Sequence, residues 1–408
     1  MRIVLFTGKG GVGKTTLAAA TAARLAHGGR KALVVSTDPA HSLGDALAAG
    51  ERPVDLGAEP AEVAGLDGLS AAHLDARALL AGAWAGLREH LRTLLAGAGV
   101  DELVAEELTV LPGVEELLAL GEVRRLAATG PWDVVVVDCG PTAETLRLLA
   151  LPDAVGGYLE RLFPAHRRAL RGLVAGGGAA RRWDRTAAAL DVLADDLAGL
   201  RALLTSADVG VRLVLTPERV VLAETRRTLT ALALHGLRVD ALIANRLVPA
   251  PPADAPGEAA AWLRERAAEQ AAVLAELGTG GVGLRTVGYR AGEPTGVPAL
   301  LELGAALWGA DDPAAPGPAA PTLRVRRTAG DGRRTDSEFE LALHLPGAEA
   351  GALDLHRIGT DELAVTAAGT RRLVALPAAL RRCTVVRARL DGDELRVVFR
   401  PDPALWLR

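Results

Sequence analysis

Lysine is rare in this chain: 46 positions carry lysine or arginine, and only Lys9, Lys14 and Lys31 are lysine. Two of these three stand in a glycine-rich stretch, GKGGVGKTT, that runs from Gly8 to Thr16. The stretch fits the pattern Gly-x-x-x-x-Gly-Lys-Thr of a phosphate-binding loop. Lysine and arginine are not interchangeable at a phosphate, because a compact ammonium fits inside such a loop and a planar guanidinium does not. The spacing therefore predicts a site for nucleotide phosphates.

Each residue type in the stretch suits that chemistry. Glycines let several backbone N–H groups approach a phosphate closely, and the helix that follows adds the positive end of its dipole. Lys14 is predicted to contact the β- and γ-phosphates, and the Thr15 hydroxyl to contact Mg²⁺. A glycine-rich turn that binds nothing is the alternative. The residues predicted to contact ATP here are Gly8, Lys9, Gly10, Gly11, Val12, Gly13, Lys14, Thr15 and Thr16.

Two more apolar runs end in an aspartate. The run WDVVVVD ends at Asp138, which fits the pattern in which a carboxylate holds Mg²⁺ through a water molecule. The second run ends near Asp38, a candidate for positioning the attacking water; the alternative is that Asp38 only caps the next helix. After Asp138, Pro141 and Thr142 are predicted to form a loop that ATP orders and hydrolysis releases.

These residues need a parallel sheet to position them. Apolar runs at 2–7, 31–37, 132–138, 212–217, 239–245 and 284–288 alternate with helical patterns, which predicts an α/β fold of the P-loop NTPase type over residues 1–308. Large helical insertions are expected at about 58–131 and 153–206. Asn245 ends one strand, where its amide could read an adenine edge.

The second insertion carries an apolar stripe at helical spacing, from Trp183 to Leu204. Packing of this stripe against the core is the simpler interpretation. The alternative is that it forms part of a groove for an apolar helix of another protein.

The periodicity changes after residue 308. Residues 309–321 read as a Pro/Ala linker without helix or strand, and residues 322–408 as a small all-β sandwich. The strands expected in this sandwich are 322–327, 338–345, 353–358, 362–366, 371–376, 383–390 and 394–400.

The amino-acid composition argues against several classes of protein. A net charge of −4 argues against a general nucleic-acid binder. The absence of a run of about 18 apolar residues argues against membrane insertion, and an N-terminal strand in place of a signal peptide points to the cytoplasm. Two cysteines, Cys139 and Cys383, are too few for a disulfide framework or a self-contained zinc site, so no zinc is expected.

Taken together, the motifs resemble the ArsA/GET-type family, which comprises the ATPases of bacterial arsenite pumps and the cytosolic factors that deliver tail-anchored membrane proteins. Residues 320–408 resemble the α-crystallin domain of small heat-shock proteins. The segments that carry the likeness are GKGGVGKTT at 8–16, DPAHS at 38–42, LPGVEE at 111–116, DCGPTAETLRLL at 138–149, Asn245, and, in the last domain, LPG at 345–347 and DGDELRVV at 391–398.

The resemblance implies a role for each matching residue. It implies a homodimer in which Lys9 acts on the nucleotide of the other subunit, with Lys14 and Asp38 as further catalytic residues. Thr15 and Asp138 would hold Mg²⁺, and Asn245 would contact adenine. An adenine-side loop would lie at Glu293-Pro294.

The leading hypothesis is a dimeric Mg²⁺-dependent ATPase that captures and releases an apolar client, such as a membrane-protein helix. One alternative is the ATPase subunit of an arsenite or anion efflux pump. The small number of cysteines argues against this alternative. Another is an ATP-switched holdase or scaffold with little need for turnover. A partitioning ATPase and an iron–sulfur reductase share the loop, but the helical insertions and the lone Cys139 fit neither.

Overall fold

The computed structural model describes residues 1–40, 42–48, 52–76, 78–79, 114–140, 195–196, 198–318, 323–332 and 334–406. The chain divides into two compact units. The first unit contains Met1–Ile3, Ala18–Val209 and Thr295–Leu300. The second contains Val4–Leu17, Gly210–Pro294 and Leu301–Arg408.

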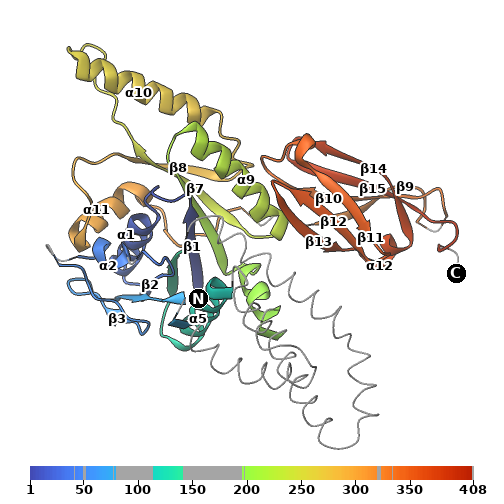
Figure 1. Cartoon of the computed structure of the whole chain (residues 1–408), viewed down its shortest axis with the longest axis horizontal. Helices are drawn as coiled ribbons and strands as arrows, with labels where there is room; N and C mark the ends of the chain where they lie inside the picture. The colour runs from blue at the N-terminus through green and yellow to red at the C-terminus, as the bar shows by residue number, and fades with distance from the viewer. Residues whose placement is uncertain are drawn as a thin grey trace, which may run out of the picture. The chain divides into compact units, whose positions relative to one another are not determined.

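Eight strands form one sheet in the order β3-β4-β2-β5-β1-β6-β7-β8. Figure 1 labels β1, β2, β3, β7 and β8 of this sheet. The pairs β2–β4, β2–β5, β6–β7 and β7–β8 are parallel, and the short β3 runs antiparallel to β4. The strands are β1 (Arg2–Gly8), β2 (Ala32–Ser36), β3 (Ala61–Glu62), β4 (Leu69–His73), β5 (Val134–Asp138), β6 (Val209–Leu215), β7 (Val239–Leu247) and β8 (Gly283–Gly288).

Four strands of this sheet are made mainly of apolar residues. Every residue of β2, β4, β5 and β6 is buried, as expected for parallel strands covered by helices on both faces. The helices are α1 (Lys14–His27), α2 (Ser42–Ala46), α5 (Val114–Thr129), α9 (Arg219–His235), α10 (Glu258–Ala275) and α11 (Gly296–Trp308). A large parallel sheet with helices of this kind confirms the predicted P-loop NTPase-like fold class.

The structure differs from the sequence interpretation at the start of the first insertion. Residues 58–131 were expected to be helical, but β3 and β4 lie there. The Ala/Leu-rich composition favours helix, whereas pairing of β4 with β2 buries Leu69–His73 completely, and such tertiary burial overrides propensity. The motif at 111–116 lies partly outside the described residues. Most of the 153–206 insertion also lies outside them, although Leu200 and Leu204 of its stripe are described and buried.

Residues 309–318, the described part of the proposed linker, contain no helix or strand, and they are anchored. Arg212 of β6 is buried and donates hydrogen bonds to Pro313 O at 3.0 Å and Ala315 O at 2.9 Å. The same guanidinium pairs with Asp240 of β7 at 3.3 Å, and Asp240 Oδ1 accepts the Gly317 N–H at 2.8 Å. One buried ion pair therefore holds the first half of the linker against strands β6 and β7.

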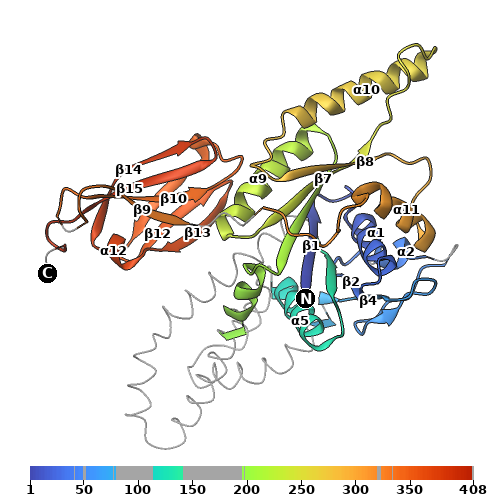
Figure 2. The same ribbon diagram turned by 180° about the vertical axis from the view of Figure 1, so that it is seen from behind.

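The C-terminal region folds as an all-β domain (Figure 2). One sheet has the order β14-β15-β10-β9 and the other β11-β12-β13, and the described pairings are antiparallel. All seven predicted strands are confirmed: β9 (Arg324–Ala329), β10 (Glu338–His344), β11 (Asp354–Ile358), β12 (Glu362–Ala367), β13 (Thr370–Ala375), β14 (Cys383–Asp391) and β15 (Glu394–Pro401). Two short helical segments, Ala350–Ala352 and α12 (Ala378–Arg381), complete the domain.

Within the second unit, the last turns of α9 contact the all-β domain. The Thr230 hydroxyl donates to Pro346 O at 2.7 Å, and Leu234 packs in the same hydrophobic cluster as Leu341, Val365 and Phe399. Gly236 then ends α9 in a left-handed conformation (φ 81°), which glycine adopts readily after a helix. The cluster thus contains a residue from outside the domain.

None of the described helices is both long enough and apolar enough to cross a membrane.

The buried pair of Arg212 and Asp240 generates a stability prediction. Asp240→Asn keeps an acceptor for Gly317 but leaves the Arg212 charge buried without its carboxylate, so the free energy of unfolding should fall by about 3–5 kcal/mol. The matched control is Asp311→Asn, which removes a 2.7 Å ion pair between Arg285 and a carboxylate that is 65% exposed. That change should cost less than about 1 kcal/mol. Equal losses in denaturant titrations of the two variants would contradict the assignment.

Candidate functional site

The glycine-rich loop joins β1 to α1. Gly13 O accepts the Leu17 N–H at 3.1 Å, so the helix begins directly after the last glycine, with Lys14 as its first residue. Lys14 is only 5% exposed, and its ammonium donates a long 3.4 Å hydrogen bond to Lys9 O. Across the described parts of the chain, no carboxylate forms an ion pair with it. A buried ammonium at the positive end of a helix favours a bound anion.

Two glycines of the loop are required by its geometry. A Cβ on Gly8 would lie 2.1 Å from Val214 O of β6, so the backbone there leaves no room for a side chain. Gly13 has φ 93°, and a Cβ on it would meet the Asn245 amide nitrogen at 2.4 Å. Close packing against β6 and β7 therefore fixes both ends of the loop.

Asn245 holds the loop through its side chain. Its Nδ2 donates to Val12 O at 2.9 Å, and its Oδ1 accepts the Arg246 N–H at 2.9 Å. The sequence places this residue at an adenine; the structure places it beside the loop, with one hydrogen and one lone pair of the amide still available. Its contact with adenine stays a prediction.

A cavity of about 330 Å³ lies next to Asn245 within the second unit. Its walls come from the start of α1, the end of β7 and the segment after β8. The lining residues are Gly13, Thr16, Asn245, Arg246, Gly288, Tyr289, Arg290, Ala291, Gly292, Glu293, Pro294 and Leu303. A cavity beyond the carboxyl ends of parallel strands is the usual place for a nucleotide in such folds.

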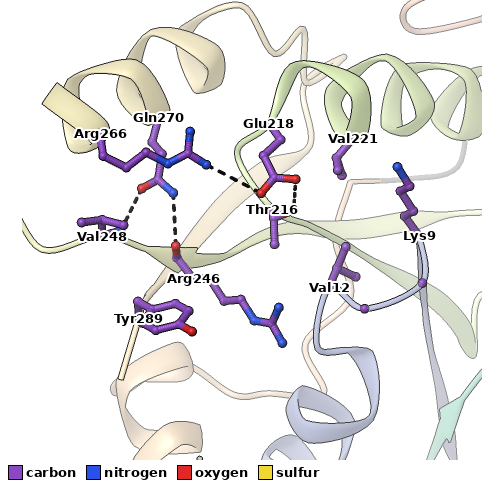
Figure 3. A pocket seen from close by; sticks show the side chains of 12 residues that line it. Lys9, Val12, Thr216, Glu218, Val221, Arg246, Val248, Arg266, Gln270 and Tyr289 are labelled. Atoms are coloured by element: carbon purple, nitrogen blue, oxygen red, sulfur yellow. Dashed lines mark hydrogen bonds and ion pairs between the residues drawn. The ribbon is translucent and has the colours of Figure 1, made fainter. Parts of the chain in front are cut away.

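A second cavity, of about 320 Å³, lies on the Lys9 side of the loop (Figure 3). Arg266 of α10 pairs with Glu218 at 3.7 Å, and the Thr216 hydroxyl donates to Glu218 at 3.4 Å. Lys9 is half-buried and stands across this cavity from Arg266. The lining residues are Lys9, Gly10, Gly11, Val12, Thr216, Glu218, Val221, Arg246, Val248, Arg266, Gln270 and Tyr289.

The two predicted aspartates, Asp38 and Asp138, lie in the first unit, and both form a hydrogen bond with Ser36. Asp138 is fully buried, and its Oδ2 accepts the Ser36 hydroxyl at 2.9 Å. The Asp38 N–H donates to the same Ser36 oxygen at 3.3 Å. Asp38 is half-buried, and its Oδ1 accepts the Ala40 N–H at 3.0 Å, so it caps its own turn and not α2, which begins at Ser42.

The structure places some of the predicted site residues together, and it adds residues that the sequence did not indicate. The loop residues, Asn245, Glu293 and Pro294 lie together in the second unit, whereas Pro141 and Thr142 lie outside the described residues. Sequence reasoning missed Ser36, Arg246 and Gln270. The position of Ser36 at the end of a strand before Asp38 was the one available signal, and Gln270 had none, because a helix far along the chain supplies it.

Among the described residues, no three His, Cys, Asp or Glu side chains gather as metal ligands. Mg²⁺ in nucleotide sites typically takes one or two protein ligands together with phosphate and water oxygens. The Thr15 hydroxyl and the Asp138 carboxylate are oxygen donors of the kind that Mg²⁺ takes. Their role as ligands stays a prediction.

The loop geometry predicts opposite effects for two glycine substitutions. Gly13→Ala forces a positive φ on alanine and a contact with Asn245, so the free energy of unfolding should fall by about 1–3 kcal/mol. Gly10→Ala is the matched control, because a Cβ there meets nothing within 4 Å and the residue has no positive φ. It should be neutral or stabilise by about 0.4–1 kcal/mol. Equal unfolding midpoints for both variants would show that the loop is not constrained as described.

The sequence of this chain matches two family models and several known proteins. Residues 1–308 match the family model described as "Anion-transporting ATPase", and residues 336–399 match one described as "HSP20-like domain found in ArsA". The chain is 43% identical over 425 residues to Protein Rv2184c of Mycobacterium tuberculosis, covering 99% of this chain and 97% of that protein.

Two further relatives differ in how much of each chain the similarity covers. Uncharacterized protein SCO2128 of Streptomyces coelicolor is 38% identical over 422 residues and matches along the whole of both chains. ATPase GET3 of Phaeosphaeria nodorum is 28% identical over 256 residues, which cover 61% of this chain and 77% of that protein. The loop around Lys14, the parallel sheet and the C-terminal all-β domain therefore belong to a known arrangement, and this protein is a member of the ArsA family of anion-transporting ATPases that carry an HSP20-like domain.

Proposed function

We propose that this protein is a homodimeric, Mg²⁺-dependent ATPase that couples ATP hydrolysis to capture and release of an apolar client, such as a membrane-protein helix. The observation that carries the ATPase part is the buried ammonium of Lys14 in a loop of glycines at the start of α1. A triphosphate supplies the negative charge that this ammonium lacks among its described neighbours, and backbone N–H groups and the helix dipole add to the attraction.

The other residues have roles that fit in-line attack of water on the γ-phosphate. Such a reaction needs positioning and charge stabilisation more than covalent chemistry. Lys14 binds the β- and γ-phosphates, Asp38 orients the attacking water, and Lys9 of the second subunit stabilises the charge of the transferring group. Thr15, and Asp138 through a water molecule, would hold Mg²⁺, which would neutralise phosphate charge.

Ser36 supports this assignment of the two aspartates. Its hydroxyl contacts the Asp138 carboxylate and the Asp38 backbone, so it ties the Asp38 turn to the end of β5. The Ala40 N–H of its own turn holds the Asp38 carboxylate, and the buried Ser36 holds the Asp38 backbone, so the side chain keeps an orientation suited to positioning water.

Substitution of Asp38 tests the catalytic role. Asp38→Asn keeps the size and turn-capping oxygen of the side chain but loses its charge, so ATP should still bind while turnover falls by a factor of about 10²–10⁴. The matched control is Asp45→Asn, on the exposed side of α2. Steady-state phosphate release measures both, and an Asp38 variant with the wild-type rate would remove this residue from the mechanism.

The family description favours anion or arsenite transport as a second candidate. Arsenite binding in proteins relies on thiolate ligands, and the two cysteines are poorly suited to it. Both are buried. Burial raises the pKa of the Cys383 thiol to about 11, although Arg357 opposes this, and the thiol donates to Ala379 O at 3.3 Å.

Ligand response separates the two candidates. ATP hydrolysis should change at least about twofold when a peptide carrying one apolar helix is added, because a client that binds one nucleotide state better shifts the cycle. Arsenite should leave the rate unchanged at pH 8, because both cysteines are buried and the Cys383 thiol, with a pKa of about 11, is almost wholly protonated at that pH. Stimulation by arsenite with no response to the peptide would favour the efflux candidate. An equally soluble peptide with charged residues in place of the apolar face is the control.

A further inference from the structure

The end of β7 is irregular where it leaves the sheet. In its pairing with β8, Ala244 lies opposite Thr286 and Leu247 opposite Gly288, so Asn245 and Arg246 together oppose one residue. This is a β-bulge, a feature that re-aims side chains and is common beside active sites. Arg246 has φ 62°, and among the described residues Ala368 is the only other non-glycine with a positive φ.

Side chains on both sides hold Arg246 in this conformation. Asn245 Oδ1 accepts the Arg246 N–H at 2.9 Å. Gln270 of α10 is 5% exposed; its Nε2 donates to Arg246 O at 3.2 Å, and its Oε1 accepts the Val248 N–H at 2.8 Å. Both backbone groups of a strained residue are thus bonded to buried or half-buried amides. Strain that the surroundings maintain in this way is concentrated at functional sites.

The result is a guanidinium placed between the two cavities. Arg246 lines both of them, as does Tyr289, whose backbone N–H donates to Leu247 O at 2.7 Å. Figure 3 shows the Arg246 side chain extending away from Gln270, past Tyr289 and toward the loop that carries Val12. Within the described structure, the guanidinium has no hydrogen-bond or ion-pair partner, and the residue is exposed.

We propose that the Arg246 guanidinium stacks on the base of the bound nucleotide, with Gln270 as the residue that positions it. This inference rests on the proposed ATPase function. A planar guanidinium stacks on aromatic faces, which an ammonium cannot do. The phosphates already have Lys14 and the loop. Arg246 lies instead with Asn245 and the 288–294 segment, in the cavity beyond the strand ends where a base is expected.

A pair of ligands tests the contact. Titration calorimetry should show that Arg246→Ala weakens ATP binding about tenfold, the size expected for loss of one stacking partner, while binding of inorganic tripolyphosphate, which has no base, stays unchanged. Arg246→Lys should behave like the alanine variant. Gln270→Met should shift the ratio of the two affinities in the same direction. Arg227→Ala, at an exposed arginine that lines neither cavity, is the control.

Arg246→Gly separates a functional from a structural role. Glycine adopts a positive φ without strain, so this variant should raise the melting temperature while it weakens ATP binding as much as alanine does. A lower melting temperature would contradict the strain argument.

The possible failures are distinguishable. Equal loss of ATP and tripolyphosphate would assign Arg246 to the phosphates and overturn the inference, as would unchanged ATP binding by Arg246→Ala. No ATP binding by the wild-type protein would overturn the proposed function itself.

Discussion

A single buried charge, the ammonium of Lys14, lies within the glycine-rich loop. Lys14 is 5% exposed, and among the described residues its ammonium donates a hydrogen bond to the Lys9 carbonyl. An ammonium removed from water is costly unless an anion or several oxygens replace the lost hydration. The surroundings are arranged for such an anion: the N-terminus of α1 points its dipole at the site, and the glycines leave the backbone open to approach.

The loop in turn depends on the strands packed against it. Gly8 lies against Val214 of β6, and Gly13 against Asn245 of β7, at separations that exclude a side chain. Strand β7 is held at both ends: Asp240 pairs with Arg212 near its start, and Asn245 and Gln270 fix the bulge at its end. Residues that follow the last helix of the ATPase region contact the first of these anchors through Pro313, Ala315 and Gly317. The linker is therefore anchored to the same strand whose other end supports the loop.

Much of this could be predicted from sequence, because local patterns carry it. The loop motif specifies its own glycines and lysines, the four-valine run before Asp138 specifies a buried strand, and alternation with turns specified all seven strands of the C-terminal domain. The features that escaped prediction depend on contacts between distant segments. Strand β4 is Ala-rich and is decided by pairing with β2. The conformation of Arg246 is imposed by Gln270, 24 residues away. The linker composition gave no sign of the buried Arg212 that anchors it.

The most direct test of this account is calorimetric titration of the purified protein with ATP in the presence of Mg²⁺, for the wild type and for Lys14→Met. Methionine keeps much of the volume of the lysine stem but carries no charge. The account predicts saturable binding by the wild type and loss of measurable binding in the variant, with the variant at least as stable as the wild type, because an uncompensated buried charge has been removed. Equal binding by the two proteins, or no binding by either, would contradict it.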